Sequence, residues 1–136
     1  MAKTVKAAKR PPIKISEIDA DSISALALSA EERLPQVAAL LLAEIDRAKM
    51  LSPAAMPDNV VTMMSTVEFI DERNGQPRTV QLVYPQEADI AQNKISILTP
   101  IGAALIGLQE GQTIEWPDRG GATRNLRVIN VSQKPH

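Results

Sequence analysis

The pair Glu31–Glu32 offers the most visible chemistry in this chain of 136 residues, because two adjacent carboxylates at a projecting turn can take part in binding or catalysis. A structural role competes with the chemical one. Ser29, followed three residues later by Glu32, matches a capping box, and Glu31 would favour the positive end of the helix dipole. We favour the structural role and keep Glu31 and Glu32 as candidates at a hairpin tip.

Other catalytic arrangements are missing from the sequence. There is no cysteine, which excludes disulfides, thiolate nucleophiles and Cys-ligated metals. The single histidine, His136, is the last residue, which argues against a His-based triad or a His-rich metal site. The glycine-rich motifs of nucleotide sites and the Gly-x-Ser-x-Gly motif are also absent. We therefore predict no catalytic residues, no metal site, no cofactor and no enzyme activity.

Three glycines, Gly102, Gly107 and Gly111, resemble a phosphate-binding loop only at first sight. A phosphate site needs free amides at the start of a helix, whereas these glycines lie within and after a predicted helix. We interpret Gly107 as a left-handed helix stop and Gly111 as a turn.

Nucleic-acid recognition has little support. The net charge is −1, and none of the three aromatic residues lies beside a basic stripe that could accompany base stacking. We predict that Phe69 and Tyr84 pack in the core, that Trp116 is partly exposed, and that there is no direct sequence-specific nucleic-acid binding. A small group of arginines near the last turn is interpreted as a solvated face: Arg119, Arg124 and Arg127.

The composition indicates an ordinary soluble chain, with 44% hydrophobic and 23% charged residues. This is enough for one core and a small appendage. No apolar run reaches the roughly 18 residues that a membrane span needs, and the N-terminus lacks the apolar core of a signal peptide. We expect a cytoplasmic protein with no membrane association.

Residues 1–12 are basic, poor in apolar side chains and end in two prolines, so we predict a disordered tail. The tail could be an electrostatic arm for nucleic acid or an acidic protein surface, or it could only solubilise the chain, and we favour the second reading. Its basic residues are Lys3, Lys6, Lys9 and Arg10.

Residues 13–52 have the pattern of a short antiparallel helical hairpin, a coiled coil in miniature. Ser16 with Asp19 resembles a capping box at the start of the first helix. Each helix has about 12 to 16 residues, so at about 1.5 Å per residue the hairpin reaches roughly 20 Å. The apolar face of the first predicted helix consists of Ile18, Ile23 and Leu26. The apolar seam of the second predicted helix consists of Leu34, Ala38, Leu41, Ile45 and Ala48. The charged residues that lie outside this seam are Glu44, Asp46, Arg47 and Lys49.

Residues 53–136 change to a period of two, which predicts strands. Prolines in residues 52–59 mark a linker, and we place the domain boundary near Pro53. Asn74–Gly75 predicts a turn between two strands. One short helix is inserted between strands instead of alternating with each of them, so we predict an α+β fold with a mostly antiparallel five-stranded sheet.

The stretch Ile95–Gly111 combines a strand, a capped helix and a glycine stop. Thr99 provides a hydroxyl N-cap, and Pro100 suits the first helical position because its missing N–H costs nothing there. We predict that Ile97, Ala104 and Leu105 hold the core, while Thr99, Pro100 and Ile101 face a partner.

Four segments resemble a known family. The run Leu98–Gly111 is similar to the signature of the C-terminal domain of Gre-type transcript cleavage factors. Together with Asp58–Met63, Leu82–Pro85 and Ile114–Pro117, it resembles the regulator of nucleoside diphosphate kinase (Rnk) family, a group related to the Gre factors. The resemblance covers about residues 13 to 132.

The resemblance implies a C-terminal domain of FKBP-like fold, without prolyl isomerase activity, that docks at the secondary channel of bacterial RNA polymerase. We expect the docking surface to include Thr99, Pro100 and Ile101, because a helix N-terminus beside a strand end presents oriented amides and an apolar side chain together. Our hypothesis is that the protein competes with longer Gre-like factors and regulates transcription and elongation, without transcript cleavage. We expect RNA polymerase as the partner and a monomer in solution.

Two alternatives stay open. Gre factors hold a catalytic magnesium ion with acidic residues at the tip of a long coiled coil, so Glu31 and Glu32 could serve a transcript cleavage cofactor. The short hairpin and the capping role of the pair speak against this. A prolyl isomerase is the weaker alternative, because three scattered aromatic residues do not supply a ring-lined pocket.

Overall fold

The computed structural model describes residues 11–117 and 123–133. Most of the predicted tail, Arg119 and His136 lie outside these residues. The elements in chain order are β1 (Lys14–Ser16), α1 (Glu17–Ser29), α2 (Pro35–Arg47), β2 (Lys49–Leu51), η2 (Pro53–Ala55), β3 (Thr66–Asp71), β4 (Gln76–Val83), η3 (Pro85–Glu87), η4 (Ile90–Gln92), β5 (Lys94–Ser96), α3 (Pro100–Leu105), β6 (Thr113–Pro117) and β7 (Thr123–Ser132).

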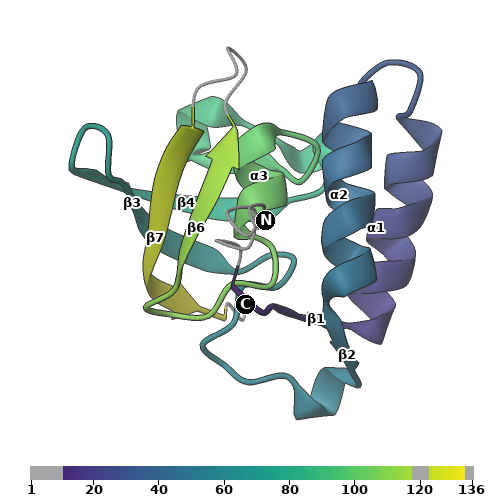
Figure 1. The fold of residues 1–136 in the computed structure, drawn as a ribbon, viewed down its shortest axis with the longest axis horizontal. Helices are drawn as coiled ribbons and strands as arrows, with labels where there is room; N and C mark the ends of the chain where they lie inside the picture. The colour runs from purple at the N-terminus through teal and green to yellow at the C-terminus, as the bar shows by residue number, and fades with distance from the viewer. Residues whose placement is uncertain (1–10, 118–122, 134–136) are drawn as a thin grey trace, which may run out of the picture.

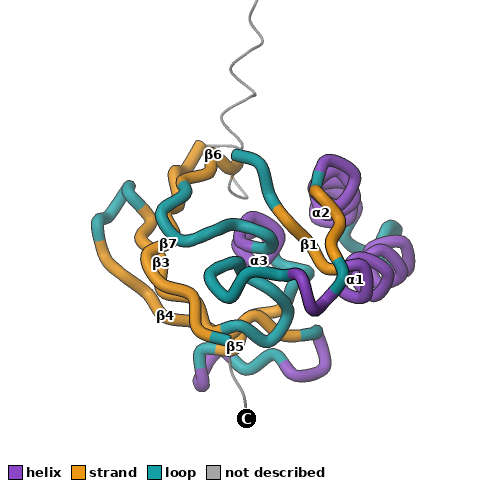
Figure 2. Tube along the Cα trace, turned by 90° about the horizontal axis from the view of Figure 1, so that it is seen from below, coloured by secondary structure: helices purple, strands orange, loops and turns teal. Residues whose placement is uncertain are grey.

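The predicted α+β class is confirmed. Helices α1 and α2 form a hairpin beside a curved sheet, and α3 lies between the hairpin and the sheet (Figures 1 and 2). The sheet has five strands in the order β5-β4-β3-β7-β6, and all pairs are antiparallel except β4 with β5. The short α3 therefore connects a parallel edge strand to the antiparallel part of the sheet.

Alternating side chains give the sheet one apolar face. In β3, Val67 and Phe69 are fully buried, whereas Glu68 between them is half-buried on the opposite face. The pairing of β3 with β7 shifts by one residue after Val128, so Ile129 is left as the extra residue of a β-bulge and is exposed. The bulge explains why the buried residues of β7, Leu126, Val128 and Val131, are spaced by two and then by three.

The core confirms the prediction for Phe69 and corrects the one for Trp116. Trp116 is only 2% exposed, because its side chain lies on the face of the sheet that packs on the core, as the other buried side chains of β6 and β7 do. Tyr84 is half-buried at the edge of the core. The predicted core residues of the α3 region, Ile97, Ala104 and Leu105, are all buried.

The start of α1 matches its predicted cap in part. The Ser16 hydroxyl accepts a hydrogen bond from the Asp19 amide at 3.0 Å. The Asp19 carboxylate does not complete the box; it accepts instead from the Met63 amide, at 3.2 Å, in the segment that precedes β3. Ile18 is 63% exposed, contrary to prediction, because it lies about 140° around the helix from the buried Ile23.

Helix α2 follows its predicted seam, since Ala38 and Leu41 are fully buried. Glu44 was expected outside this seam, yet it is only 1% exposed. Arg47 compensates for the burial by donating two hydrogen bonds to the Glu44 carboxylate, at 2.7 and 3.0 Å, and a third to the Pro11 carbonyl at 2.6 Å. A buried carboxylate is tolerated here because a guanidinium meets it.

A two-stranded parallel sheet, which the sequence did not predict, closes the base of the hairpin. Strand β1 pairs with β2, and the Lys49 amide donates to the Ile13 carbonyl at 2.9 Å. Ile13 and Ile15 are buried in the same apolar cluster as the sheet residues. The hairpin and the sheet therefore share one core. In the described part of the chain, no helix has both the length and the apolar character needed to cross a membrane.

Burial raises the pKa of the Asp19 carboxyl above its ordinary value, although the hydrogen bond from Met63 opposes this shift. The folded state therefore binds this proton more tightly than the unfolded state does. Stability should fall as the pH rises from about 3.9, the usual aspartate value, through the raised folded pKa.

We expect Asp19→Asn to remove this loss, because asparagine keeps an oxygen for the Met63 amide and carries no charge. The gain in melting temperature of the variant over the parent protein should grow as the pH rises from about 3.9 through the raised folded pKa. Asp21→Asn, which neutralises an exposed carboxylate of the same helix, is the control. A difference between Asp19→Asn and the parent that does not change with pH would contradict the prediction.

Candidate partner-binding site

Helix α3 begins as its sequence predicts. The Thr99 hydroxyl accepts a hydrogen bond from the Gly102 amide at 3.1 Å and donates one to the Ser96 carbonyl at 2.7 Å. Pro100 occupies the first helical position. The hydroxyl therefore joins the end of β5 to the start of α3 and fixes where the next side chains lie.

The start of α3 offers a partner an apolar surface, and few of its backbone amides are free. Thr99, Pro100 and Ile101 are half-buried, so part of each remains accessible. Pro100 has no amide hydrogen, and the Gly102 and Ala103 amides both donate to Thr99. The expected row of oriented amides is thus mostly used within the turn, and what remains for a partner is the apolar part of Pro100 and Ile101.

A groove of about 460 Å³ lies between this turn and the start of α2. Leu98 and Pro100 line it from the α3 side, and side chains at the beginning of α2 line it from the other. Sequence reasoning missed the α2 contribution, because the contact between α2 and α3 joins segments more than sixty residues apart. The α2-side residues are Arg33, Leu34, Pro35, Gln36 and Val37.

The hairpin tip corrects the capping interpretation of Glu31 and Glu32. Helix α1 continues through Ser29, whose hydroxyl donates back to the Leu26 carbonyl at 2.8 Å. Helix α2 starts only at Pro35, with Leu34 as a cap residue that offers no side-chain hydrogen bond. The serine signal failed because a hydroxyl at the last helical position can bond backwards as well as forwards.

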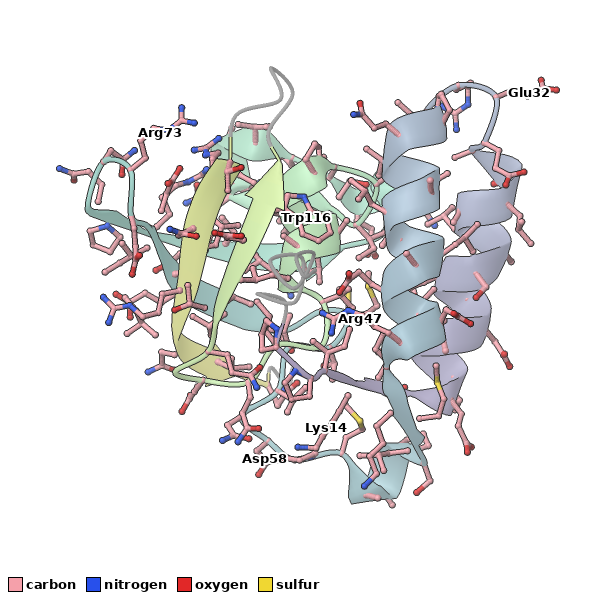
Figure 3. The ribbon with its side chains drawn as sticks, in the orientation of Figure 1. Lys14, Glu32, Arg47, Asp58, Arg73 and Trp116 are labelled. Carbon is pink, nitrogen blue, oxygen red and sulfur yellow. The ribbon has the colours of Figure 1, made fainter. Side chains whose placement is uncertain are left out.

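Glu31 and Glu32 are consequently exposed residues of the turn between the helices, with no capping role. Figure 3 shows Glu32 at the far end of the hairpin, pointing away from the body of the protein. The structure brings neither glutamate to Thr99, Pro100 and Ile101, although Arg33 and Leu34, which follow directly, line the groove. Within the described ranges, no three His, Asp or Glu side chains are grouped so that they could hold a metal ion.

The interpretation of Gly107 and Gly111 is confirmed. Both have a left-handed backbone, with φ of +83° and +90°, and both follow α3. Gly107 ends the helix, and its amide donates to the Val61 carbonyl at 3.0 Å. Its amide is therefore bonded within the protein and not offered to a phosphate.

Taken together, the fold and the groove define a two-part α+β protein in which a short helical hairpin is fixed to a small sheet domain, with an apolar groove where they meet. Two family descriptions match it: "Rnk N-terminus" over residues 11–51 and "Transcription elongation factor, GreA/GreB, C-term" over residues 56–133. The chain belongs to the Rnk family of Gre-related proteins.

Individual relatives agree with this assignment. The chain is 39% identical, over 93% of each sequence, to the regulator of nucleoside diphosphate kinase of Escherichia coli. A solved structure described as a GreA/GreB transcription elongation factor from Nitrosomonas europaea is 40% identical, with a TM-score of 0.69, covering 90% of this chain and 99% of that one. The GreA of Bartonella henselae is 38% identical over 64% of this chain, which spans 55% of that longer protein.

The position of α3 depends on Gly102, which gives a test. A Cβ atom at this residue would meet the Ser96 carbonyl oxygen at 2.4 Å, a distance that forces β5 and α3 apart. Helix propensity alone favours alanine over glycine by about 1 kcal/mol, whereas overpacking costs about 1–3 kcal/mol.

We expect Gly102→Ala to lower the free energy of unfolding by about 1–2 kcal/mol in urea denaturation. Ala103→Gly in the same helix is the matched comparison, and it should also destabilise. If Gly102→Ala stabilises the protein while Ala103→Gly destabilises it, propensity governs this helix and the packing argument is wrong.

Proposed function

We propose that this protein is a transcription regulator that binds RNA polymerase. The single observation that supports this most is the apolar groove beside Pro100 in a chain of the Gre-related Rnk family. One relative is named as a regulator of nucleoside diphosphate kinase and another as the transcription elongation factor GreA. The surface at Thr99, Pro100 and Ile101 docks at the entrance of the polymerase secondary channel.

The two-part architecture suits this role. Residues 53–136, a Gre-type domain of FKBP-like fold, carry the docking turn, and residues 13–52 form the hairpin. Each helix has 13 residues, so the hairpin extends about 20 Å. A protein docked through the groove would block the channel entrance and compete with longer Gre-like factors, and it acts as a cytoplasmic monomer without sequence-specific nucleic-acid contacts.

Transcript cleavage is not part of the proposed activity. A capping role can no longer be used as an argument against cleavage, because Glu31 and Glu32 are exposed and do not cap a helix. The argument from length remains, because a hairpin of about 20 Å holds its carboxylates near the channel entrance. Magnesium takes six oxygen ligands, so at a tip with two carboxylates the others would come from water or from the polymerase.

The docking surface is tested by the double variant Pro100→Asp, Ile101→Asp. New carboxylates in an apolar contact would be desolvated without partners, so polymerase affinity should fall at least about tenfold. Biolayer interferometry with purified core polymerase measures the effect, and circular dichroism checks the fold.

Ile90→Asp is the matched control. Ile90 is 78% exposed and does not line the groove, so this change adds one carboxylate in place of an isoleucine elsewhere on the surface. The control should bind like the parent protein. Equal loss in both variants, or none in the double variant, would rule out this docking surface.

The tip carboxylates are tested with stalled elongation complexes and magnesium. We expect no shortening of the RNA in the presence of the parent protein, and the same result with Glu31→Ala, Glu32→Ala. Magnesium-dependent shortening that the double variant abolishes would instead establish a cleavage cofactor that uses this pair. Glu17→Ala, an exposed glutamate at the opposite end of the hairpin, controls for a loss of surface charge.

A further inference from the structure

The loop between β3 and β4 contains Asn74, the only asparagine in the chain that is followed by glycine. This loop projects from the sheet on the side opposite the hairpin (Figure 1), and residues 72–75 are all exposed. Asparagine is a thermolabile residue, because its side-chain amide can be displaced by the backbone nitrogen of the next residue. The turn that Asn74 and Gly75 form does not use this chemistry, so the pair has a property beyond its role in the fold.

The attacking group in such a reaction would be the Gly75 nitrogen, and the structure leaves it uncrowded. Gly75 has a left-handed backbone with φ of +70°, and a Cβ atom built on it would meet no heavy atom within 4 Å. Glycine can therefore adjust its backbone as a ring closes. The Gly75 amide donates to the Asp71 carbonyl at 3.0 Å, but this carbonyl also accepts from the Asn74 amide at 3.2 Å. It keeps a partner when Gly75 gives up its hydrogen.

The group under attack, the side-chain carbonyl of Asn74, is held and polarised by the loop itself. Its Oδ1 atom accepts a hydrogen bond from the Gln76 amide at 2.9 Å. This bond closes a ring of chain that includes the Gly75 nitrogen, so the side chain stays folded toward that nitrogen. A donor on Oδ1 also stabilises the negative charge that the oxygen gains when the carbon becomes tetrahedral, as an oxyanion hole does.

The other four asparagines of the chain lack this combination. Each is followed by a side chain that crowds the attacking nitrogen. Asn125 and Asn130 are also exposed, but they lie within β7, which pairs with a strand on either side and holds its backbone extended. The residues that follow these four asparagines are Val60, Lys94, Leu126 and Val131.

We propose that Asn74 is a site of spontaneous deamidation in the folded protein. The Gly75 nitrogen, after losing its proton to water or hydroxide, forms a bond to Cγ of Asn74, and the bond between Cγ and the side-chain nitrogen breaks. Ammonia leaves with a proton from water, and the product is a cyclic imide. Water then opens the imide at either carbonyl, which gives aspartate or isoaspartate. One water is consumed and one ammonia is released for each asparagine converted.

The product changes the end of the β3–β4 hairpin in two ways. Either form adds a negative charge next to Arg73, which Figure 3 shows on the projecting loop. Isoaspartate also routes the backbone through the former side chain, which lengthens the turn between the paired residues Asp71 and Gln76. The modification is independent of polymerase docking, because Asn74 does not line the groove.

The test incubates the folded full chain at mildly alkaline pH and follows each asparagine by peptide mass spectrometry. We expect conversion at Asn74 to be at least about tenfold faster than at Asn125 and Asn130, which a barrier lower by about 1.4 kcal/mol produces. The rate should rise with pH, because the nitrogen attacks only after it has lost its proton. Labelling with an isoaspartyl methyltransferase should detect the isoaspartate product.

The variant Gly75→Asn adds a side chain beside the attacking nitrogen and keeps a residue that tolerates a left-handed backbone. It should slow conversion at Asn74 by at least about tenfold. The control is Gly111→Asn, the same substitution at another left-handed glycine with open space around it, and it should leave the rate at Asn74 unchanged. Conversion at Asn74 no faster than at Asn125, or a rate that Gly75→Asn leaves unchanged, would overturn the proposal.

Discussion

Close contact between Gly107 and the segment that leads into β1 fixes how the two parts of the protein meet. A Cβ atom at Gly107 would lie 2.9 Å from the Ile13 Cβ and 3.1 Å from the Lys14 carbonyl oxygen, and the Lys14 amide donates to the Gly107 carbonyl at 3.2 Å. Glycine is thus required here for space as well as for its positive φ. Because Ile13 enters the core at this point, the contact sets the position of α1 and α2 against α3, and with it both sides of the groove.

Local chemistry explains what the sequence could predict. The Thr99 cap, the proline at the first helical position and the glycine stop at residue 107 each depend on neighbours within four residues, and all three are present in the structure. The alternation in β3 likewise follows from one strand with one buried face. The bulge at Ile129 could not be predicted, because it depends on the register between β7 and β3, which meet far apart in sequence.

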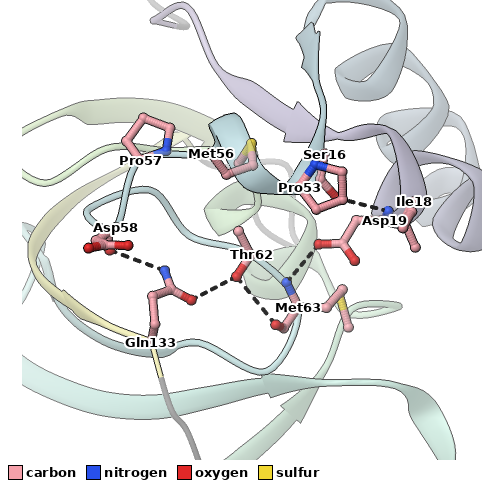
Figure 4. Close-up of a pocket in the computed structure, with 10 residues that line it drawn as sticks. All are labelled: Ser16, Ile18, Asp19, Pro53, Met56, Pro57, Asp58, Thr62, Met63 and Gln133. Atoms are coloured by element: carbon pink, nitrogen blue, oxygen red, sulfur yellow. Dashed lines mark hydrogen bonds between the residues drawn. The ribbon is translucent and has the colours of Figure 1, made fainter.

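Two of the errors arose where a polar side chain had a partner that is distant in sequence. The Asp19 carboxylate accepts a hydrogen bond from the Met63 amide (Figure 4) instead of completing the cap of its own helix. Glu44 is buried beside Arg47, which donates hydrogen bonds both to the Glu44 carboxylate and to the Pro11 carbonyl. In both cases the sequence pattern identified a helix position correctly and assigned the wrong surroundings. Non-local packing decides those surroundings, so the groove, which is built from two separate segments, became visible only in the structure.

The groove and the hydrogen bond between Asp19 and Met63 lie toward opposite ends of the hairpin. The groove includes the first turn of α2, whereas Asp19 lies in the first turn of α1, and α1 and α2 run antiparallel (Figure 1). A partner seated in the groove would hold the tip end while the parallel pair β1–β2 and the Asp19–Met63 hydrogen bond hold the base. The pairing of β1 with β2 and the burial of Ile13 and Ile15 fix the base within the protein itself, so the direction of the hairpin does not depend on a bound partner.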